Sequence, residues 1–287
     1  MHDLASRIRI KSSKGLSFRG VRWFHEIRDR KQVRLARFGR QSAYFYMNVP
    51  GLIQFRIRKD GSEIAYRAHA SLSPSDIAGL ISTQAMPMAL QLRGFTVLHA
   101  CAVKIGGKAA LFLGPQGQGK STLAAAFLAA GYSVLSDDVV PLLFTHGKPR
   151  VIPAAPEIRL FASTAKRVLP RKWLANSTPV LHKRRITLDR KSHVSRPLEV
   201  SCIFLLETSA KLKIEELSGA SALSGALRSC FRLDIGNPRL LRGELESLAR
   251  LVEEVPAYRL RYPRGLAKLE TMVRGIARKI KDEQSAD

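Results

Sequence analysis

The sequence predicts an α/β protein in which helices flank a mixed sheet, with a β-rich N-terminal extension before it. Three features lead to this prediction. A short apolar segment, 108–113, runs into a glycine-rich loop and then into a helical segment, 121–130. Just upstream, 95–105 is a second apolar segment joined to the first by Gly106-Gly107, which indicates an antiparallel hairpin. From residue 20 to residue 70 the pattern alternates as strands do.

The N-terminal part divides into a tail and a strand-rich region. Residues 1–18 are polar and basic, and we expect a flexible tail. Strands are expected at 42–47 and 53–57, and the turn at 59–62 leads into a third strand that starts at Glu63.

A helix is expected to follow from 73–76 to about Leu92, kinked by Pro87 and ended by Gly94. The region 19–92 is either a small substrate-recruiting subdomain or an extension at the edge of the main sheet, and we favour the extension. The remaining residues, 93–287, are expected to form one domain that contains the glycine-rich loop.

The loop at 114–121 fits the phosphate-binding pattern G-x-x-x-x-G-K-[S/T] at every position. Its glycines let backbone N–H groups surround an anion, the lysine reaches the β- and γ-phosphates, and the serine hydroxyl completes a Mg²⁺ shell. A glycine-rich turn that binds nothing is the alternative, but strand, loop and helix follow in the required order. We therefore predict that ATP, or alternatively GTP, binds with Mg²⁺ to these residues: Gly114, Pro115, Gln116, Gly117, Gln118, Gly119, Lys120, Ser121 and Thr122.

Two acidic residues, Asp137 and Asp138, end the next apolar segment, 131–136. One carboxylate can help to hold Mg²⁺ while the other accepts the proton of an attacking hydroxyl. A turn at the strand exit would also favour aspartate. His99 lies in the strand before the loop, where a histidine is either a packed residue or a part of the site.

These residues together resemble the catalytic domain of the HPr kinase/phosphorylase family and its HPr-kinase-like relatives. That family carries a histidine-bearing strand, a G-x-x-G-x-G-K-S loop, a helix ending in glycine and a strand closing in Asp-Asp. Here the matching residues are His99, 114–121, Gly131 and the pair Asp137-Asp138. The resemblance covers residues 93–287 well and implies a P-loop mixed sheet of the HPr kinase/PEP carboxykinase type.

The resemblance also implies roles for individual residues. It implies that Ser121, Asp138 and Glu157 hold Mg²⁺, and that an aspartate of the pair accepts the proton. It implies that His99 and Lys120 lie beside the γ-phosphate. The Glu-Ile-Arg stretch that begins at Glu157 lacks the glycines of the family motif, so we expect a kinase without phosphorylase activity. The layout is closest to relatives found with lasso-peptide genes, which phosphorylate a serine of a peptide precursor, and relatives of the family form homo-oligomers.

Composition indicates a cytoplasmic protein. No segment approaches the roughly 18 apolar residues of a membrane span, and no N-terminal stretch resembles a signal peptide. The three cysteines, Cys101, Cys202 and Cys230, have no metal-site spacing and read as buried apolar residues in a reducing compartment. We expect neither a zinc site nor membrane association.

The net charge is +25, and the excess is concentrated. Residues 1–60 contain 15 basic and 4 acidic side chains, and 166–196 contain 10 basic residues and one acidic residue. Such fields attract acidic partners. An acidic peptide or protein substrate is favoured over nucleic acid, because neither region interleaves aromatic and basic residues as single-strand platforms do. A third interpretation also stays open, namely that these charges only form a solvated surface and bind no partner.

The remaining chain contains further expected elements. The basic stretch after Phe161 is either a mobile lid or a surface loop. Strands are expected at 200–206, 213–217 and 257–260. Helices are expected from 218 to Cys230, at 240–255 and at 266–280. Arg228 and Arg232, near the end of the first of these helices, are candidates to neutralise transferring charge.

A serine kinase acting on a peptide or small protein is therefore the leading hypothesis. A small-molecule kinase on the same scaffold and a nucleic-acid-associated NTPase are the alternatives.

Overall fold

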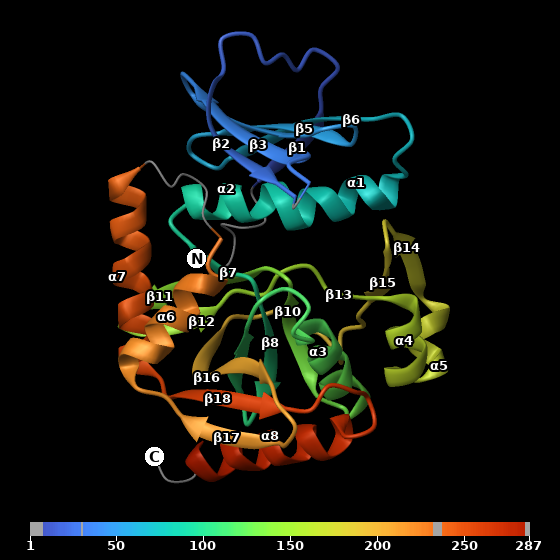
Figure 1. Cartoon of the computed structure of the whole chain (residues 1–287), viewed down its shortest axis with the longest axis vertical. Coiled ribbons are helices and arrows are strands. Elements are labelled where there is room, and N and C mark those ends of the chain that lie inside the picture. Colours follow the sequence, from blue (N-terminus) through green and yellow to red (C-terminus); the bar gives the residue numbers. More distant parts are fainter. Residues whose placement is uncertain (1–7, 30, 232–236, 285–287) are drawn as a thin grey trace. The chain divides into compact units, whose positions relative to one another are not determined.

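The computed structural model describes residues 8–29, 31–231 and 237–284, and the chain divides into two compact units (Figure 1). The first unit contains the described residues up to Phe95 together with 237–238. The second contains Thr96–Phe231 and the described residues from Arg239 onward. The expected boundary after residue 92 falls shortly before this division.

A six-stranded sheet forms most of the first unit. Its strands are β1 (Arg9–Ser12), β2 (Arg22–Arg28), β3 (Arg34–Gln41), β4 (Tyr44–Val49), β5 (Ile53–Arg58) and β6 (Glu63–Ala68). The order is β1-β6-β5-β4-β3-β2, and all neighbours are antiparallel except β1 and β6. Alternate residues of β5 are buried, namely Ile53, Phe55 and Ile57, as the period of a strand requires.

The expected flexible tail is wrong for residues 9–12, because they form β1. This strand pairs in parallel with β6, and Arg9 and Lys11 both form ion pairs with Glu63, at 2.6 and 3.0 Å. Glu63 is a buried acid, so the two basic residues compensate its charge. A parallel partner more than 50 residues away leaves no local signal in the sequence.

The helix after the sheet is interrupted by a turn of π-helix. It consists of α1 (Pro74–Leu80), the π-turn η1 (Ile81–Ala85) and α2 (Met86–Leu92). Ser73 and Asp76 form the capping box that starts α1. Pro87 falls in the first turn of α2, directly after the π-turn, so the missing N–H of proline is accommodated there.

The second unit is built on a nine-stranded mixed sheet. Its strands are β7 (Thr96–Leu98), β8 (Ala100–Ile105), β9 (Lys108–Leu113), β10 (Ser133–Asp137), β11 (Val140–Thr145), β12 (Lys148–Val151), β16 (Leu198–Thr208), β17 (Lys213–Glu216) and β18 (Ala257–Tyr262). The path is β10-β8-β9-β16-β12-β11-β7, and β18 joins β16 and β17. The predicted α/β class with a mixed sheet and a β8–β9 hairpin is confirmed.

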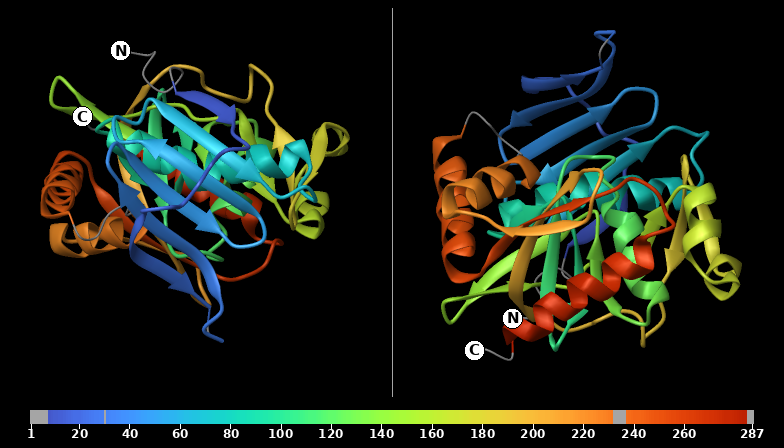
Figure 2. Two further views of the ribbon diagram at one scale, coloured as in Figure 1. Left: turned by 90° about the horizontal axis from the view of Figure 1, so that it is seen from above. Right: turned by 60° about the horizontal axis from the view of Figure 1, so that its bottom comes forward.

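Helices cover both faces of this sheet. They are α3 (Lys120–Ala129), α6 (Gly219–Ser229), α7 (Pro238–Glu254) and α8 (Leu269–Gln284). Phe112 of β9 packs with α3 and α8, whereas Leu111 and Leu113 pack with α6 and α7. In the right-hand view of Figure 2, α8 (red) runs across the sheet. Because β9 is buried on both faces, it is apolar throughout, as the sequence indicates.

The basic stretch after Phe161, expected to be a mobile lid or a surface loop, is largely built from helices and strands. It contains α4 (Ala162–Val168) and α5 (Arg171–Ala175). A small antiparallel sheet also forms from β13 (Glu157–Leu160), β15 (Lys183–Thr187) and β14 (Ser177–Val180). Trp173, Leu160 and Ile186 pack against Leu128 of α3 in one apolar cluster. This cluster packs the small sheet against α3, the helix that follows the glycine-rich loop.

Cys101 and Cys202 are buried, as expected, and Cys230 is partly exposed; all three are free thiols. Within the described ranges no helix is both long enough and apolar enough to cross a membrane.

Candidate functional site

The predicted site residues meet at one edge of the nine-stranded sheet. Leu113, the last residue of β9, lies opposite Ala100 at the start of the antiparallel β8, so His99 and Gly114 lie at the same edge. The end of β10 reaches this edge too, because Asp137 lies opposite Cys101 of β8. Sheet register therefore brings together a histidine, a loop and an acid pair that are separated in the sequence.

The glycine-rich loop joins β9 to α3. Gly117 and Gly119 have φ values of +84° and +79°, which other residues rarely adopt. Gly119 directly precedes α3, and no side chain caps this helix end. An uncapped helix start of this kind suits an anion at the positive end of the helix dipole.

Lys120 is 5% exposed, and its amine lies within the loop. Nζ donates hydrogen bonds to the carbonyl oxygens of Gly114, at 2.6 Å, and Pro115, at 3.1 Å. Burial lowers the pKa of Lys120, while the thiol of Cys101 and the acid pair oppose that shift. A charged amine that is held only by carbonyls can exchange them for phosphate oxygens, which carry a full negative charge.

The neighbouring strand β16 and the next strand β18 hold the loop in place. The Tyr262 hydroxyl at the end of β18 donates to the carbonyl oxygen of Gln118. The Thr208 hydroxyl at the end of β16 donates to Gln118 Oε1 at 2.8 Å, and Arg264 Nε lies 3.4 Å from the Thr208 oxygen. Burial raises the pKa of Tyr262 to about 12, so the hydroxyl stays a donor. Sequence reasoning missed Thr208, Tyr262 and Arg264, because only the pairing of β16 with β9 and β18 brings them to the loop.

The two aspartates occupy different surroundings. Asp137 Oδ2 accepts a hydrogen bond from the Arg159 backbone N–H at 3.1 Å, whereas the buried Oδ1 has no partner with ordinary hydrogen-bond geometry. Burial and then the Asp138 charge raise the pKa of Asp137 to about 7. The Arg159 N–H, the Ser121 hydroxyl and the Lys183 amine oppose this rise. A buried carboxylate oxygen beside Ser121 fits a Mg²⁺ site that phosphates would complete.

Asp138 lies in a left-handed turn with φ of +67°, which is uncommon for a residue other than glycine. His99 Nδ1 lies 3.0 Å from the Asp138 carbonyl oxygen. Because a carbonyl only accepts, Nδ1 carries the proton and Nε2 of the neutral ring is an acceptor. Burial and the Lys120 charge lower the pKa of His99, which keeps the ring neutral near pH 7. His99 therefore contacts the turn that carries the acid pair.

Glu157 forms ion pairs with two arginines. Its Oε1 lies 2.6 Å from Arg159 Nη2, and its Oε2 lies 3.8 Å from Arg185 Nε. Among the residues that the structure describes, no group of three or more His, Cys, Asp or Glu side chains is arranged to hold a metal ion. The resemblance implies Ser121, Asp138 and Glu157 as the Mg²⁺ ligands, and this set stays a prediction; the buried carboxylate oxygen next to Ser121 belongs to Asp137.

Lys183 belongs to the basic run 182–185, and nothing in the sequence assigns it a role at the site. It lies on β15, two residues from Arg185, and its charge acts on the pKa of Asp137, Lys120 and His99. The sequence shows a basic run at 182–185, but only the fold places it near the acid pair. Arg228 instead donates to Ser224 of its own helix, at 3.0 Å, and Arg232 lies outside the described residues.

Comparisons with known proteins add little to this geometry. No family model matches the chain, and no curated relative matches it. Among solved structures, the Hpr(Ser) kinase/phosphatase from Coxiella burnetii is similar at 14% identity and a TM-score of 0.35. The alignment covers 66% of this chain and 95% of that chain. A likeness this weak carries no conclusion about activity, so the functional proposal depends on the residues of the site.

Proposed function

We propose that this chain is a Mg²⁺-dependent kinase that transfers the γ-phosphate of ATP to a serine of a peptide or small protein. One observation carries the proposal. A glycine-rich loop with a buried lysine lies at the same sheet edge as Asp137, whose buried oxygen has no partner and whose pKa is raised to about 7. Such a carboxylate needs a cation or a proton, and a nucleotide with Mg²⁺ supplies the cation.

Each residue then has a separate task. The loop N–H groups and Lys120 bind the phosphates and neutralise charge that develops during transfer. Ser121 and Asp137 would hold Mg²⁺, which would supply further charge neutralisation. Asp138, in the turn that His99 fixes, accepts the proton of the attacking hydroxyl. This assignment gives the cation to Asp137, whereas the family resemblance implies Asp138.

The basic surroundings favour an acidic acceptor. Lys183 lies within electrostatic reach of Asp137, and Arg185 lies two residues further along the same strand. Alternate residues of a strand share a face, so both side chains lie on one side of the small sheet. An acidic peptide would be attracted to this face. A lasso-peptide precursor is one substrate of this kind.

The test is phosphate transfer from γ-labelled ATP with Mg²⁺ to acidic peptides that contain serine. We expect labelled phosphoserine with the wild type. Lys120→Ala and Asp138→Asn should each reduce the rate by at least 100-fold, because each removes a group that acts in the transition state.

Matched controls separate the site from the general charge of the chain. Asp189→Asn removes an exposed aspartate, and Lys166→Ala removes an exposed lysine of α4. Both variants should keep the wild-type rate. Labelled phosphoserine of equal intensity from wild type and Lys120→Ala would refute the proposal.

A nucleic-acid-associated NTPase is a second candidate, favoured by one observation in the first unit. The Arg37 guanidinium stacks on Trp23 at 3.8 Å from the ring centroid, and that of Arg56 stacks on Tyr44 at 4.6 Å. The Nε atoms of both arginines are buried without a hydrogen-bond partner. Basic and aromatic residues do not alternate in the sequence of this region. Strand pairing nevertheless places arginines against aromatic rings on the sheet of the first unit. Phosphate release that single-stranded DNA or RNA stimulates, with no labelled peptide, would favour this candidate.

A further inference from the structure

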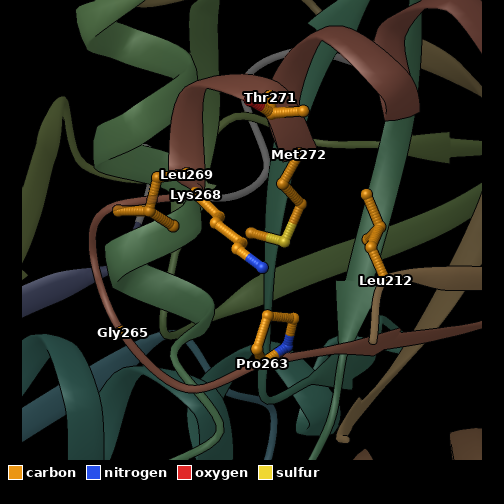
Figure 3. Close-up of a pocket in the computed structure, with 7 residues that line it drawn as sticks. All are labelled: Leu212, Pro263, Gly265, Lys268, Leu269, Thr271 and Met272. Atoms are coloured by element: carbon orange, nitrogen blue, oxygen red, sulfur yellow. The ribbon is translucent and has the colours of Figure 1, made fainter. Parts of the chain in front are cut away.

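A pocket lies where the segments after β16 and β18 meet the start of α8 (Figure 3). Its volume is about 330 Å³, at the lower end of the roughly 300–1,000 Å³ that small-molecule sites occupy. Leu212, Pro263, Leu269 and Met272 give it apolar walls, and Lys268 adds an amine. Met272 is 4% exposed, so the base of the pocket is part of the core.

The pocket adjoins the glycine-rich loop. Tyr262, which donates to the Gln118 carbonyl, directly precedes Pro263 in the pocket wall. Arg264 contacts Thr208, which in turn donates to the Gln118 side chain. The contacts that hold the loop thus come from the same two segments that line the pocket.

Sheet order fixes the direction in which a nucleotide must extend. The acid pair lies at the end of β10, on the β8 side of β9, whereas β16 and β18 lie on the other side. A nucleotide whose γ-phosphate lies between Lys120 and the acids therefore carries its nucleoside away from β10. The pocket lies on this side, next to the ends of β16 and β18.

We propose that this pocket binds the purine base of the nucleotide, an inference that rests on the proposed function. A purine is flat and largely apolar, with ring nitrogens that accept hydrogen bonds. Leu212, Pro263 and Met272 provide apolar contact for its faces, and in Figure 3 the Lys268 amine extends into the space between Pro263 and Met272. Lys268 is exposed, and its ammonium group only donates, so it suits an acceptor of the ring.

The experiment compares the affinity for ATP with that for inorganic tripolyphosphate, both with Mg²⁺, by calorimetry. Wild type should bind ATP at least tenfold more tightly, because only ATP carries a base. The double variant Leu212→Ser/Lys268→Ser should lose most of this advantage and keep its affinity for tripolyphosphate. The control Leu245→Ser/Lys281→Ser changes a leucine of similar exposure in α7 and an exposed lysine at the far end of α8, and should keep the advantage.

Photolabelling then locates the bound base directly. Irradiation with 8-azido-ATP should label peptides that contain Leu212 or residues 263–272, as found by mass spectrometry. Wild type that binds ATP and tripolyphosphate equally, or label only in peptides away from these segments, would overturn the pocket while leaving the kinase proposal intact. Wild type that binds neither compound would instead remove the proposed function and the pocket with it.

Discussion

Replacing Asp137 by asparagine should stabilise the second unit at neutral and alkaline pH. The pKa of this carboxyl rises from the 3.8 of an ordinary aspartate to about 7, because burial and the Asp138 charge disfavour ionisation. Asparagine keeps an oxygen for the Arg159 N–H but carries no charge. Each pKa unit corresponds to about 1.4 kcal/mol, so the ionised carboxylate costs at most about 4 kcal/mol. Because Asp137 is partly exposed to water, we expect a gain of about 1–3 kcal/mol.

The pH dependence of this gain has a definite sign. Below pH 3.8 both folded and unfolded chains carry the protonated acid, and the variant gains nothing. Between pH 3.8 and about 7 the unfolded chain releases the proton and the folded chain keeps it, so wild-type stability falls as pH rises. Above pH 7 the cost is complete, and the difference between variant and wild type becomes constant.

Urea unfolding followed by tryptophan fluorescence measures this difference. The chain contains two tryptophans, Trp23 in the first unit and Trp173 in the second, so a Trp23→Phe background reports the second unit alone. Asp189→Asn is the control of opposite sign. Hydrogen bonds from the Ser192 side chain and backbone lower the pKa of Asp189, so its replacement should bring no gain at high pH. An Asp137→Asn variant that is less stable than wild type at pH 8.5, or a gain that does not change with pH, would refute the reasoning.

Two further predictions concern the loop and the small sheet. Gly119→Ala should cost about 1–2 kcal/mol of stability, because φ is +79° at this position. The variant should also bind ATP at least tenfold more weakly, because the new Cβ would lie 3.1 Å from the Tyr262 hydroxyl that holds the loop. Gly131→Ala, with φ of +87° and nothing within 4 Å, should lose similar stability in urea titrations but bind ATP normally; equal loss of binding in both would contradict the loop's role. Trp173→Ala should cost about 3–5 kcal/mol in the second unit and expose 162–196 to hydrogen exchange, whereas Trp23→Ala should not. Unchanged exchange in Trp173→Ala would mean that this stretch does not depend on the apolar cluster.

Much of the second unit was predictable because its signals are local. An apolar strand, a glycine-rich loop and a helix ended by glycine lie within 108–131, and β9, α3 and Gly131 take these positions. The β8–β9 hairpin follows from two glycines between apolar segments. Each of these features depends on backbone preferences and periodicity over a few residues, which the sequence states directly.

The partners of the site residues were decided by the tertiary structure. Glu157 pairs with Arg159 of its own strand and with Arg185 of β15, which the register of β13 with β15 brings near it, while the buried Oδ1 of Asp137 has no hydrogen-bond partner of ordinary geometry. Thr208 and Tyr262 reach the loop only because β16 pairs with β9 and β18 pairs with β16. The basic stretch after Phe161 is ordered because Trp173 and Ile186 pack in one apolar cluster with Leu128 of α3.

The sequence by itself therefore determined the α/β class, the loop and the acid pair. The tertiary structure decided which carboxylate is left without a partner, which side chains hold the loop, and which strands border the pocket. The physical reason is that burial and charge compensation depend on sheet order and register, which join residues far apart in the chain.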